Sequence, residues 1–174
     1  MTSSSGPGDS SSAQARLGAP DVQGAFRGRT LGVALVGRVL VVVHNSQPPA
    51  QDEWVRYCAL VGAHHDGLAG QFIIAEGPGP NAIQRQQSLN RLPKGYAIPP
   101  SAVLTRSVMV RGIVNLFNWF TPRAMRAFPP EDLSAAAQHL GMTDAQVQRL
   151  MDLARLLMPD ASQSQGDTTS AAHL

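Results

Sequence analysis

The chain has 174 residues, a formal net charge of +2 at pH 7, 43% hydrophobic residues and one cysteine. This length fits a single domain of ordinary size, and the lone Cys58 excludes both an internal disulfide framework and a zinc site made of several cysteines. No run of about 18 uncharged apolar residues occurs, so a membrane span is not expected. The N-terminal sequence MTSSSGPGDSSS lacks the basic and apolar regions of a secretory signal. We therefore expect a cytoplasmic protein.

The two ends of the chain differ in composition from the middle. Residues 1–24 consist largely of Ser, Gly, Ala and Pro with scattered charge, and residues 159–174 are similar. Both have too little apolar surface to offset the entropy of ordering and are predicted to be disordered tails. Residues 25–158 are predicted to form one domain, in which 133–158 are a C-terminal helix pair. This domain is mildly basic with scattered charges, which permits an acidic partner without requiring one.

The middle of the chain alternates between strand and helix patterns. The β-branched runs 30–36 and 39–44 flank Gly37 and Arg38 and predict a tight hairpin. The helix that follows is predicted to begin near Pro48 and Pro49. Further strands are predicted at 71–76, 101–107 and 126–128, and further helices at 81–92, 110–120, 131–141 and 143–158, the last two broken at Gly141.

This order predicts an α/β fold. Helices between successive strands imply crossover connections and a mostly parallel sheet. We therefore expect a single mixed sheet, with the N-terminal β-hairpin as its antiparallel edge and with helices packed on it.

Three strings in this order resemble the STAS fold, in particular the divergent SpoIIAA-like branch, of STAS/SEC14 type. VLVVVHNSQPPAQDEWVRYCALV resembles that branch's second strand and first helix, and SAVLTRSVMVRGIVNLFNWF resembles its late strand and the helix after it. RAFPPEDLSAAAQHLG resembles its closing segment. The similarity covers roughly residues 30–141 and rests on hydrophobic patterns. It implies a small regulatory or docking module rather than an enzyme.

The sequence departs from this family at one functional position. STAS phosphoswitches carry a phosphorylatable Ser or Thr at the start of the helix after the third strand. Here the corresponding string is GPGPNA, with Asn81 near the helix start and no hydroxyl before Ser88. The resemblance therefore implies that the phosphoswitch is absent.

Few residues suggest catalysis or metal binding. His64, His65 and Asp66 could ligate a metal or form a base with its orienting group, but neighbouring residues at a helix end diverge, and a solvated helix C-terminus explains them. Cys58 lies on an apolar helix face, so we expect it to be packed rather than reactive. The carboxylate pairs 52–53 and 131–132 each stand at a helix start, where capping explains them. We expect no catalytic residue, no metal and no cofactor.

Two further segments could bind a ligand or a nucleic acid. The GPGPN loop, 77–81, precedes a helix at the carboxyl ends of the strands and is a candidate for a small ligand, although its prolines remove donors. The helices within 133–150 have Ala137, Gly141 and Val147 at helix-turn-helix spacing. Their DNA-contacting side chains would be Thr143, Gln146 and Arg149. With Asp144 beside them, this surface suits phosphates poorly, and we do not expect nucleic-acid binding.

Three functions remain open after this survey. The first is docking of a regulatory protein partner on 77–92 and the adjacent 45–52 loop, with Asn81, Gln84, Arg85 and Ser46 as contact residues. The second is a transcriptional regulator that uses 133–150. The third is a carrier of a small molecule or lipid, because the SpoIIAA-like branch resembles lipid-transfer domains, and it would need an apolar pocket beneath Ile113, Leu116 and Phe120. The apolar helix 110–120, which ends in Phe117, Trp119 and Phe120, could also offer a partner surface, so a homodimer stays open.

Overall fold

A computed structural model describes residues 15–94, 96, 98–120 and 124–159, with the backbone alone for 115–120. The strands are β1 (Val22–Arg27), β2 (Leu31–Val36), β3 (Val39–His44), β4 (Gly70–Ala75), β5 (Ser101–Leu104) and β6 (Met125–Phe128). The helices are α2 (Gln51–His64), the 3-10 turn η1 (His65–Gly67), α3 (Ala82–Asn90), α4 (Val108–Phe120), α5 (Leu133–Leu140) and α6 (Asp144–Leu157). In these ranges no helix is long and apolar enough to cross a membrane.

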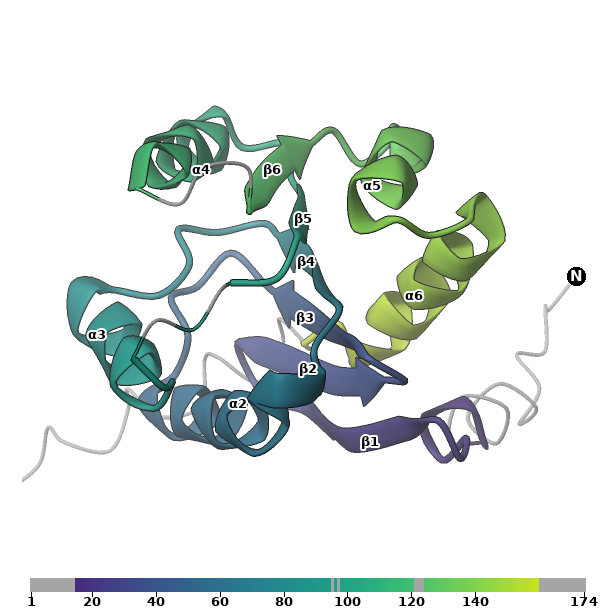
Figure 1. Ribbon diagram of the computed structural model, residues 1–174, viewed down its shortest axis with the longest axis horizontal. Helices are drawn as coiled ribbons and strands as arrows, with labels where there is room; N and C mark the ends of the chain where they lie inside the picture. The colour runs from purple at the N-terminus through teal and green to yellow at the C-terminus, as the bar shows by residue number, and fades with distance from the viewer. Residues whose placement is uncertain (1–14, 95, 97, 121–123, 160–174) are drawn as a thin grey trace, which may run out of the picture.

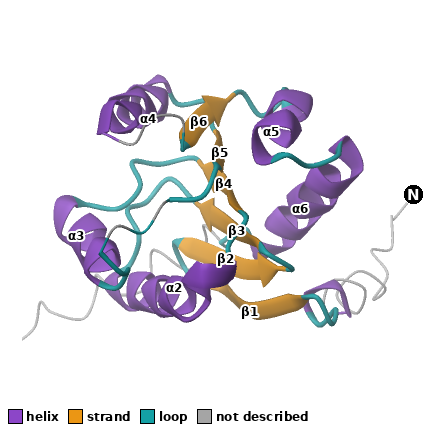
Figure 2. Ribbon diagram, viewed as in Figure 1, coloured by secondary structure: helices purple, strands orange, loops and turns teal. Residues whose placement is uncertain are grey.

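The strands form one mixed sheet whose spatial order follows the chain, β1-β2-β3-β4-β5-β6. The first three strands are antiparallel, and β3 to β6 are parallel. Each parallel step is bridged by one helix, α2, α3 or α4. Because successive right-handed crossovers advance in the same direction, these helices share one face of the sheet. The pair α5 and α6 returns over the other face, as Figures 1 and 2 show.

The two faces of the sheet are packed differently. Under α5 and α6 lies one continuous apolar cluster, with Phe72, Leu104 and Leu157 among its fully buried members. The opposite face has two smaller clusters, one under α2 around Trp54 and one under α4 around Val110. The sheet face under α5 and α6 therefore carries a single apolar core, whereas the opposite face carries two separate apolar clusters.

A buried carboxylate fixes α2 to the turn between β1 and β2. Glu53, 4% exposed, accepts hydrogen bonds from the backbone N–H groups of Arg29 (2.5 Å) and Leu31 (3.0 Å). It also accepts from the backbone and the hydroxyl of Thr30, at 3.0 and 2.6 Å. The sequence had indicated only a charge at the helix start for Glu53. The structure shows instead that this side chain joins α2 to the sheet.

The predicted α/β class, the hairpin and the mostly parallel sheet are confirmed. The hairpin β2–β3 turns at Gly37, whose φ of 58° lies in the left-handed region that glycine favours. The hairpin is not the edge of the sheet, however, because β1 pairs outside it and forms the antiparallel edge. The predicted N-terminal tail is also wrong at its inner end, since residues 22–24 belong to β1. This strand is mostly exposed and its register shifts between Gln23 and Phe26, so it lacks a clear alternating pattern.

The C-terminal helix pair has its predicted turn. Gly141 ends α5 with a φ of 65°, and Asp132 begins it by accepting from the backbone N–H of Ala135 at 3.2 Å. Both helices pack on the sheet, and Ala137 and Val147 are buried in the core there. The helix-turn-helix spacing therefore arises from two helices that close an α/β domain.

Candidate functional site: an apolar cavity between the sheet and the crossover helices

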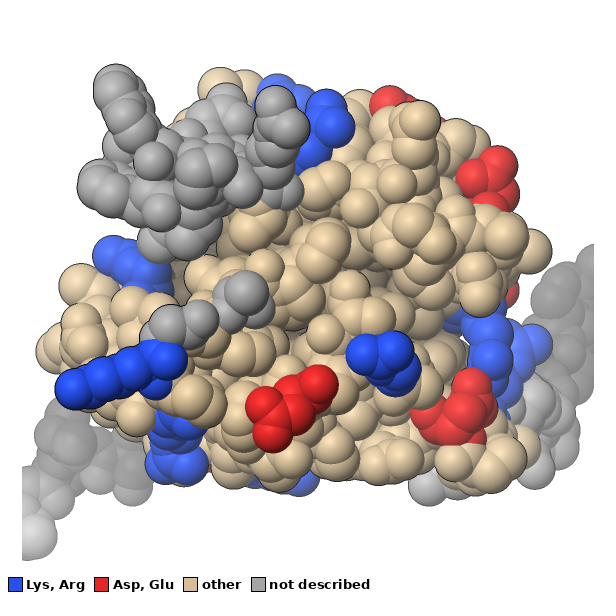
Figure 3. All heavy atoms as spheres, viewed as in Figure 1, with Lys and Arg blue, Asp and Glu red and all other residues tan. Residues whose placement is uncertain are grey.

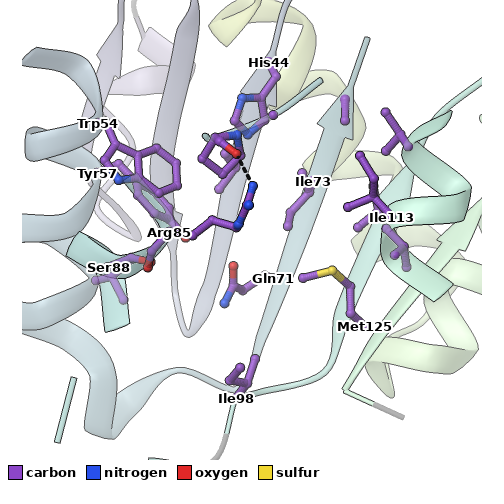
Figure 4. Close-up of a pocket in the computed structure, with 18 of the residues that line it drawn as sticks. His44, Trp54, Tyr57, Gln71, Ile73, Arg85, Ser88, Ile98, Ile113 and Met125 are labelled. Atoms are coloured by element: carbon purple, nitrogen blue, oxygen red, sulfur yellow. Dashed lines mark hydrogen bonds between the residues drawn. The ribbon is translucent and has the colours of Figure 1, made fainter. Parts of the chain in front are cut away.

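A partly open cavity of about 250 Å³ lies between the sheet and α2, α3 and α4. Its floor is made by β3, β4 and β5, and its walls by the three helices, the 77–80 loop and the segment that leads into β5. The close-up in Figure 4 shows side chains from these elements turned towards the same space. The apolar lining includes Val42, Trp54, Tyr57, Val61, Ile73, Ala75, Leu89, Leu92, Ile98, Val103, Val110, Ile113, Val114 and Met125.

The composition of α3 explains why this space is not filled. The helix sequence AIQRQQSLN is largely polar, and its only buried residue is Gln84. α3 therefore packs against α2 rather than on the sheet, and Figure 1 shows it standing away from the strands. With no large apolar side chain from α3 buried on the sheet, the clusters under α2 and α4 stay separate, and the cavity lies between them.

Polar contacts hold α3 at this position. The indole N–H of Trp54 donates to the carbonyl oxygen of Gln84 at 2.7 Å, and the Gln84 side-chain amide donates to the carbonyl oxygen of Pro49 at 2.8 Å. Asn81 and Gln84 form a reciprocal capping box at the start of α3. These hydrogen bonds fix one wall of the cavity to α2 without apolar packing on the sheet.

His44 is the buried polar group of the cavity floor. It closes β3, is 5% exposed, and its Nδ1 has no hydrogen-bond partner within the described residues. Burial lowers the pKa of its imidazole to about 4, so the ring is neutral at neutral pH. An unpartnered buried polar atom costs about 1–3 kcal/mol. Figure 4 shows the ring turned into the cavity.

The 77–80 loop and Arg85 line the cavity near His44. The Arg85 guanidinium donates to the carbonyl oxygen of Pro80 at 2.7 Å. Gly77 lies against the loop after β3, where a Cβ would come within 2.6 Å of the Asn45 carbonyl oxygen and 2.7 Å of the Ser46 backbone. The glycine therefore permits two loops at the carboxyl ends of β3 and β4 to meet. The GPGPN segment predicted to be a small-ligand candidate does lie at a cavity.

The four residues expected to contact a protein partner lie in different environments. Asn81 and Ser46 are exposed, and Arg85 is partly buried at the cavity. Gln84 is 2% exposed and is occupied by the capping box and by Pro49, so its proposed role as a surface contact is wrong. A polar helix suggests that every Gln faces solvent, whereas this amide replaces the apolar contact that would otherwise hold the helix.

The residues considered for DNA contact are engaged elsewhere. The hydroxyl of Thr143 accepts from the backbone of Gln146, whose side chain accepts in return from the backbone of Thr143. Arg149 forms an ion pair with Asp21 at 2.7 Å. On the face shown in Figure 3, basic side chains lie in separate spots with acidic ones among them rather than in one patch. Nothing here favours the transcriptional interpretation.

Cys58 and His65, which were considered for catalysis or metal binding, are held by packing and local contacts. Cys58 is buried in the cluster under α2, and burial raises the pKa of its thiol, which confirms the predicted packing role. The ring of His65 contacts the Gly62 carbonyl oxygen at 2.8 Å and the Asp66 carboxylate at 3.0 Å. The described residues contain no cluster of three or more metal-ligating side chains.

The carrier hypothesis required an apolar pocket beneath Ile113, Leu116 and Phe120, and the cavity meets this requirement at one of the three residues. Ile113 lines the cavity. The side chains of Leu116, Phe117, Trp119 and Phe120 lie outside those that the structure describes. His44, which the sequence analysis missed, ends a run of five β-branched or leucine residues, VLVVV. A histidine closing a strand before a loop was the available signal.

Comparison with known proteins finds similarity among solved structures. No protein-family model and no curated protein matches the chain. Among solved structures, the chain is similar to an uncharacterised protein of the DUF3478 family from Shewanella loihica PV-4, described as having a SpoIIAA-like fold. The two share 16% sequence identity with a TM-score of 0.47, over 66% of this chain and 95% of that chain.

Proposed function

We propose that this chain is a non-enzymatic binding module whose cavity holds a small, largely apolar molecule. The observation that carries this proposal is the cavity itself, which is apolar, partly open and bounded on one side by α2 and α3, which hydrogen bonds join to each other. Its volume of about 250 Å³ is slightly below the range of about 300–1,000 Å³ for pockets that take drug-sized ligands. The ligand is therefore a small molecule, or one part of a larger one.

The surroundings of the candidate catalytic groups support a non-enzymatic role. The Cys58 thiol is buried with a raised pKa, which opposes formation of a nucleophilic thiolate. The Glu53 carboxylate is occupied by the β1–β2 turn, and Asp132 caps α5. None of these groups is among the residues that line the cavity.

Native mass spectrometry of the purified full chain tests this function. We expect a mass above that of the sequence under gentle conditions, and the sequence mass after denaturation. Ala75 lines the cavity, so Ala75→Leu should remove the excess by filling part of the space. Ala59→Leu changes an exposed alanine of α2 and is the matched control. Proteins at the sequence mass under both conditions would count against a resident ligand.

Docking of a regulatory protein partner is a second function that we propose. It is favoured by two apolar side chains on α3, Ile83 at 70% and Leu89 at 54% exposed. Ile83 is the more exposed of the two and does not line the cavity, whereas Leu89 borders it. Asn81 lies at the start of the same helix and Ser46 in the loop beside it, so both remain proposed contacts.

A pull-down with matched variants tests this docking surface. Ile83→Asp removes an exposed apolar side chain, whereas Gln86→Asp changes an exposed polar residue on the same helix. A partner that docks on α3 should be lost with Ile83→Asp and retained with Gln86→Asp. A partner that is retained by both variants would show that it does not dock on α3. Sedimentation of the same variants shows whether the partner is a second copy of the chain.

A further inference from the structure

The polar side chains that line the cavity fall into two groups. Some already donate hydrogen bonds to backbone carbonyl oxygens. These bonds run from Trp54 to Gln84, from Arg85 to Pro80, from Ser88 to Arg85 and from Tyr96 to His65, at 2.7, 2.7, 2.8 and 3.2 Å. The others, His44, Tyr57 and Gln71, form no side-chain hydrogen bond within the described part of the chain.

The side chains of this second group are uncharged at neutral pH. Burial lowers the pKa of His44 to about 4, and burial raises the pKa of the Tyr57 hydroxyl above its usual range. The Gln71 amide does not titrate. The groups that a ligand could satisfy are therefore neutral hydrogen-bonding groups.

Two of these groups stand at opposite ends of the cavity floor. In the parallel register of β3 and β4, His44 pairs with Ala75, and Gln71 lies four residues before Ala75 on the same strand. Because a parallel strand rises about 3.3 Å per residue, His44 and Gln71 are about 13 Å apart along the sheet. Residues 71, 73 and 75 share one face of β4, and Figure 4 shows Ile73 between the two polar ends.

The chemistry of the two ends selects a hydroxyl. The Nδ1 atom of a neutral imidazole donates or accepts according to its tautomer, and the Gln71 amide can do both. A hydroxyl also donates and accepts, so it pairs with either end. A charged group would need a charged partner to offset its lost hydration, and neither His44 nor Gln71 is charged.

We propose that the cavity binds an uncharged, elongated molecule with a hydroxyl group at each end, one at His44 and one at Gln71, and an apolar body between them. The body would lie along Val42, Ile73 and Val103, which line the cavity from three adjacent strands. This proposal rests on the binding function proposed above and adds the chemical class of the ligand. It also supplies the partner that the buried Nδ1 of His44 lacks.

Calorimetric titration of the full chain at neutral pH tests the two-ended ligand. Diols of six, eight and ten carbons, with a hydroxyl at each end, are each compared with the monoalcohol of the same length. A second hydroxyl that reaches a polar partner should tighten binding about two- to tenfold, and we expect this at eight or ten carbons. A second hydroxyl buried without a partner would instead weaken binding about fivefold or more.

Octanedioate tests whether the ends of the ligand are uncharged. It carries a carboxylate at each end of a body of the same length as the eight-carbon diol. We expect it to bind at least tenfold more weakly than that diol, because neither end of the cavity offers it a charged partner.

Substitutions assign the two ends to the named side chains. Gln71→Met keeps an unbranched side chain and removes the donor and the acceptor, so diol affinity should fall about tenfold or more. The monoalcohol, which can still bind at His44, should keep its affinity. His44→Leu should give the same pattern, with the monoalcohol bound at Gln71. Gln86→Met, which changes an exposed glutamine of α3, and Tyr57→Phe should both leave the advantage of the diol unchanged.

The outcomes separate this inference from the function on which it rests. The two-ended assignment is overturned if every diol binds more weakly than its monoalcohol, if octanedioate binds more tightly than the diol, or if the diol advantage survives Gln71→Met or is lost with Tyr57→Phe. An apolar ligand would then remain in place. Unfolding midpoints show whether each variant folds, and Gln71→Met decides alone if His44→Leu does not. Failure of all the alcohols to bind also overturns the assignment, and if the mass excess is absent as well, the binding function fails with it.

Discussion

Glu53 illustrates how one buried charge can determine the position of a helix. Its carboxylate accepts four hydrogen bonds from residues 29–31, and Arg29 lies 3.6 Å from it as a counter-ion. Hydrogen bonds to a charged group contribute about 1.5–3 kcal/mol each. The adjacent Asp52 meets the same arginine at 3.0 Å, but both partners of that pair are exposed.

Glu53→Gln is expected to lower the free energy of unfolding by about 2–4 kcal/mol, because the amide turns an N–H group towards backbone donors that are left unpaired. Asp52→Asn is the matched control and should cost less than about 1 kcal/mol. Urea unfolding of both variants measures the difference. Similar losses for the two would mean that the Glu53 hydrogen bonds contribute little net stability.

His44 makes stability depend on pH. In the unfolded chain a histidine titrates near 6.5, whereas burial lowers the pKa of His44 to about 4. Below about 6.5 the unfolded chain takes up a proton that the folded protein does not. The stabilisation is therefore complete above this pH and is lost as the pH falls towards about 4, by roughly 3 kcal/mol in all.

Urea unfolding between about pH 7 and about pH 4 measures this loss. We expect the His44→Leu variant to lose less stability over this range than the wild type. The carboxylates that also titrate there are common to both proteins, so the difference isolates His44. Identical pH dependence in the two proteins would contradict a neutral, buried His44.

At the scale of elements, α6 lies unusually close to β2. A Cβ at Gly32 would collide with the carbonyl oxygen of Leu157, at the end of α6. The helix and the strand meet at this position through backbone atoms, and the apolar cluster on that face depends on the close contact.

Gly32→Ala should therefore cost about 1–3 kcal/mol, because the backbone of one element must shift. Gly62→Ala provides the contrast. A Cβ at Gly62, inside α2, meets only the Arg91 carbonyl oxygen at 3.9 Å, so this substitution should stabilise the protein by roughly 0.5–1 kcal/mol. Thermal unfolding of the two variants should move the midpoint in opposite directions.

The elements themselves could largely be predicted from the sequence, and the reasons are local. The runs 30–36 and 39–44 carry a strong β-branched signal, and Gly141 marks a helix end. β1 was missed because it is an exposed edge strand, interrupted by a glycine at φ 59°, and only its pairing with β2 makes it a strand. Its existence depends on a neighbour that no local pattern describes.

At the scale of the whole molecule, the two faces of the sheet should respond differently to added volume. Ala75 in β4 faces the cavity, whereas Ala102 in β5 is fully buried in the continuous core. Ala75→Leu should leave stability unchanged or raise it by about 1 kcal/mol, since it fills empty space. Ala102→Leu should cost about 1–3 kcal/mol by overpacking. Equal losses in urea unfolding would indicate that the cavity is closed in solution.

The site was less predictable than the fold. The 77–81 loop was recognised as a ligand candidate because glycine and proline before a helix leave a recognisable pattern. The cavity was not predicted, because it exists where α3 buries no large apolar side chain on the sheet. A polar helix sequence predicts that the helix is exposed, but it does not predict an empty space between the helix and the sheet. Gln84 was misplaced for the same reason, since its burial depends on Pro49 and Trp54, which come from a different part of the chain.

The hydrogen bond between the Trp54 indole and the Gln84 carbonyl allows the cavity to be followed by tryptophan fluorescence. Trp54 also lines the cavity, so its fluorescence depends both on the polarity of the space and on the position of α3. Trp119 is the other tryptophan of the chain, and Trp119→Phe would leave Trp54 as the single fluorophore. Entry of a ligand would then change the colour or intensity of its emission, and displacement of α3 would break the indole hydrogen bond. The protein thus carries its own reporter of occupancy.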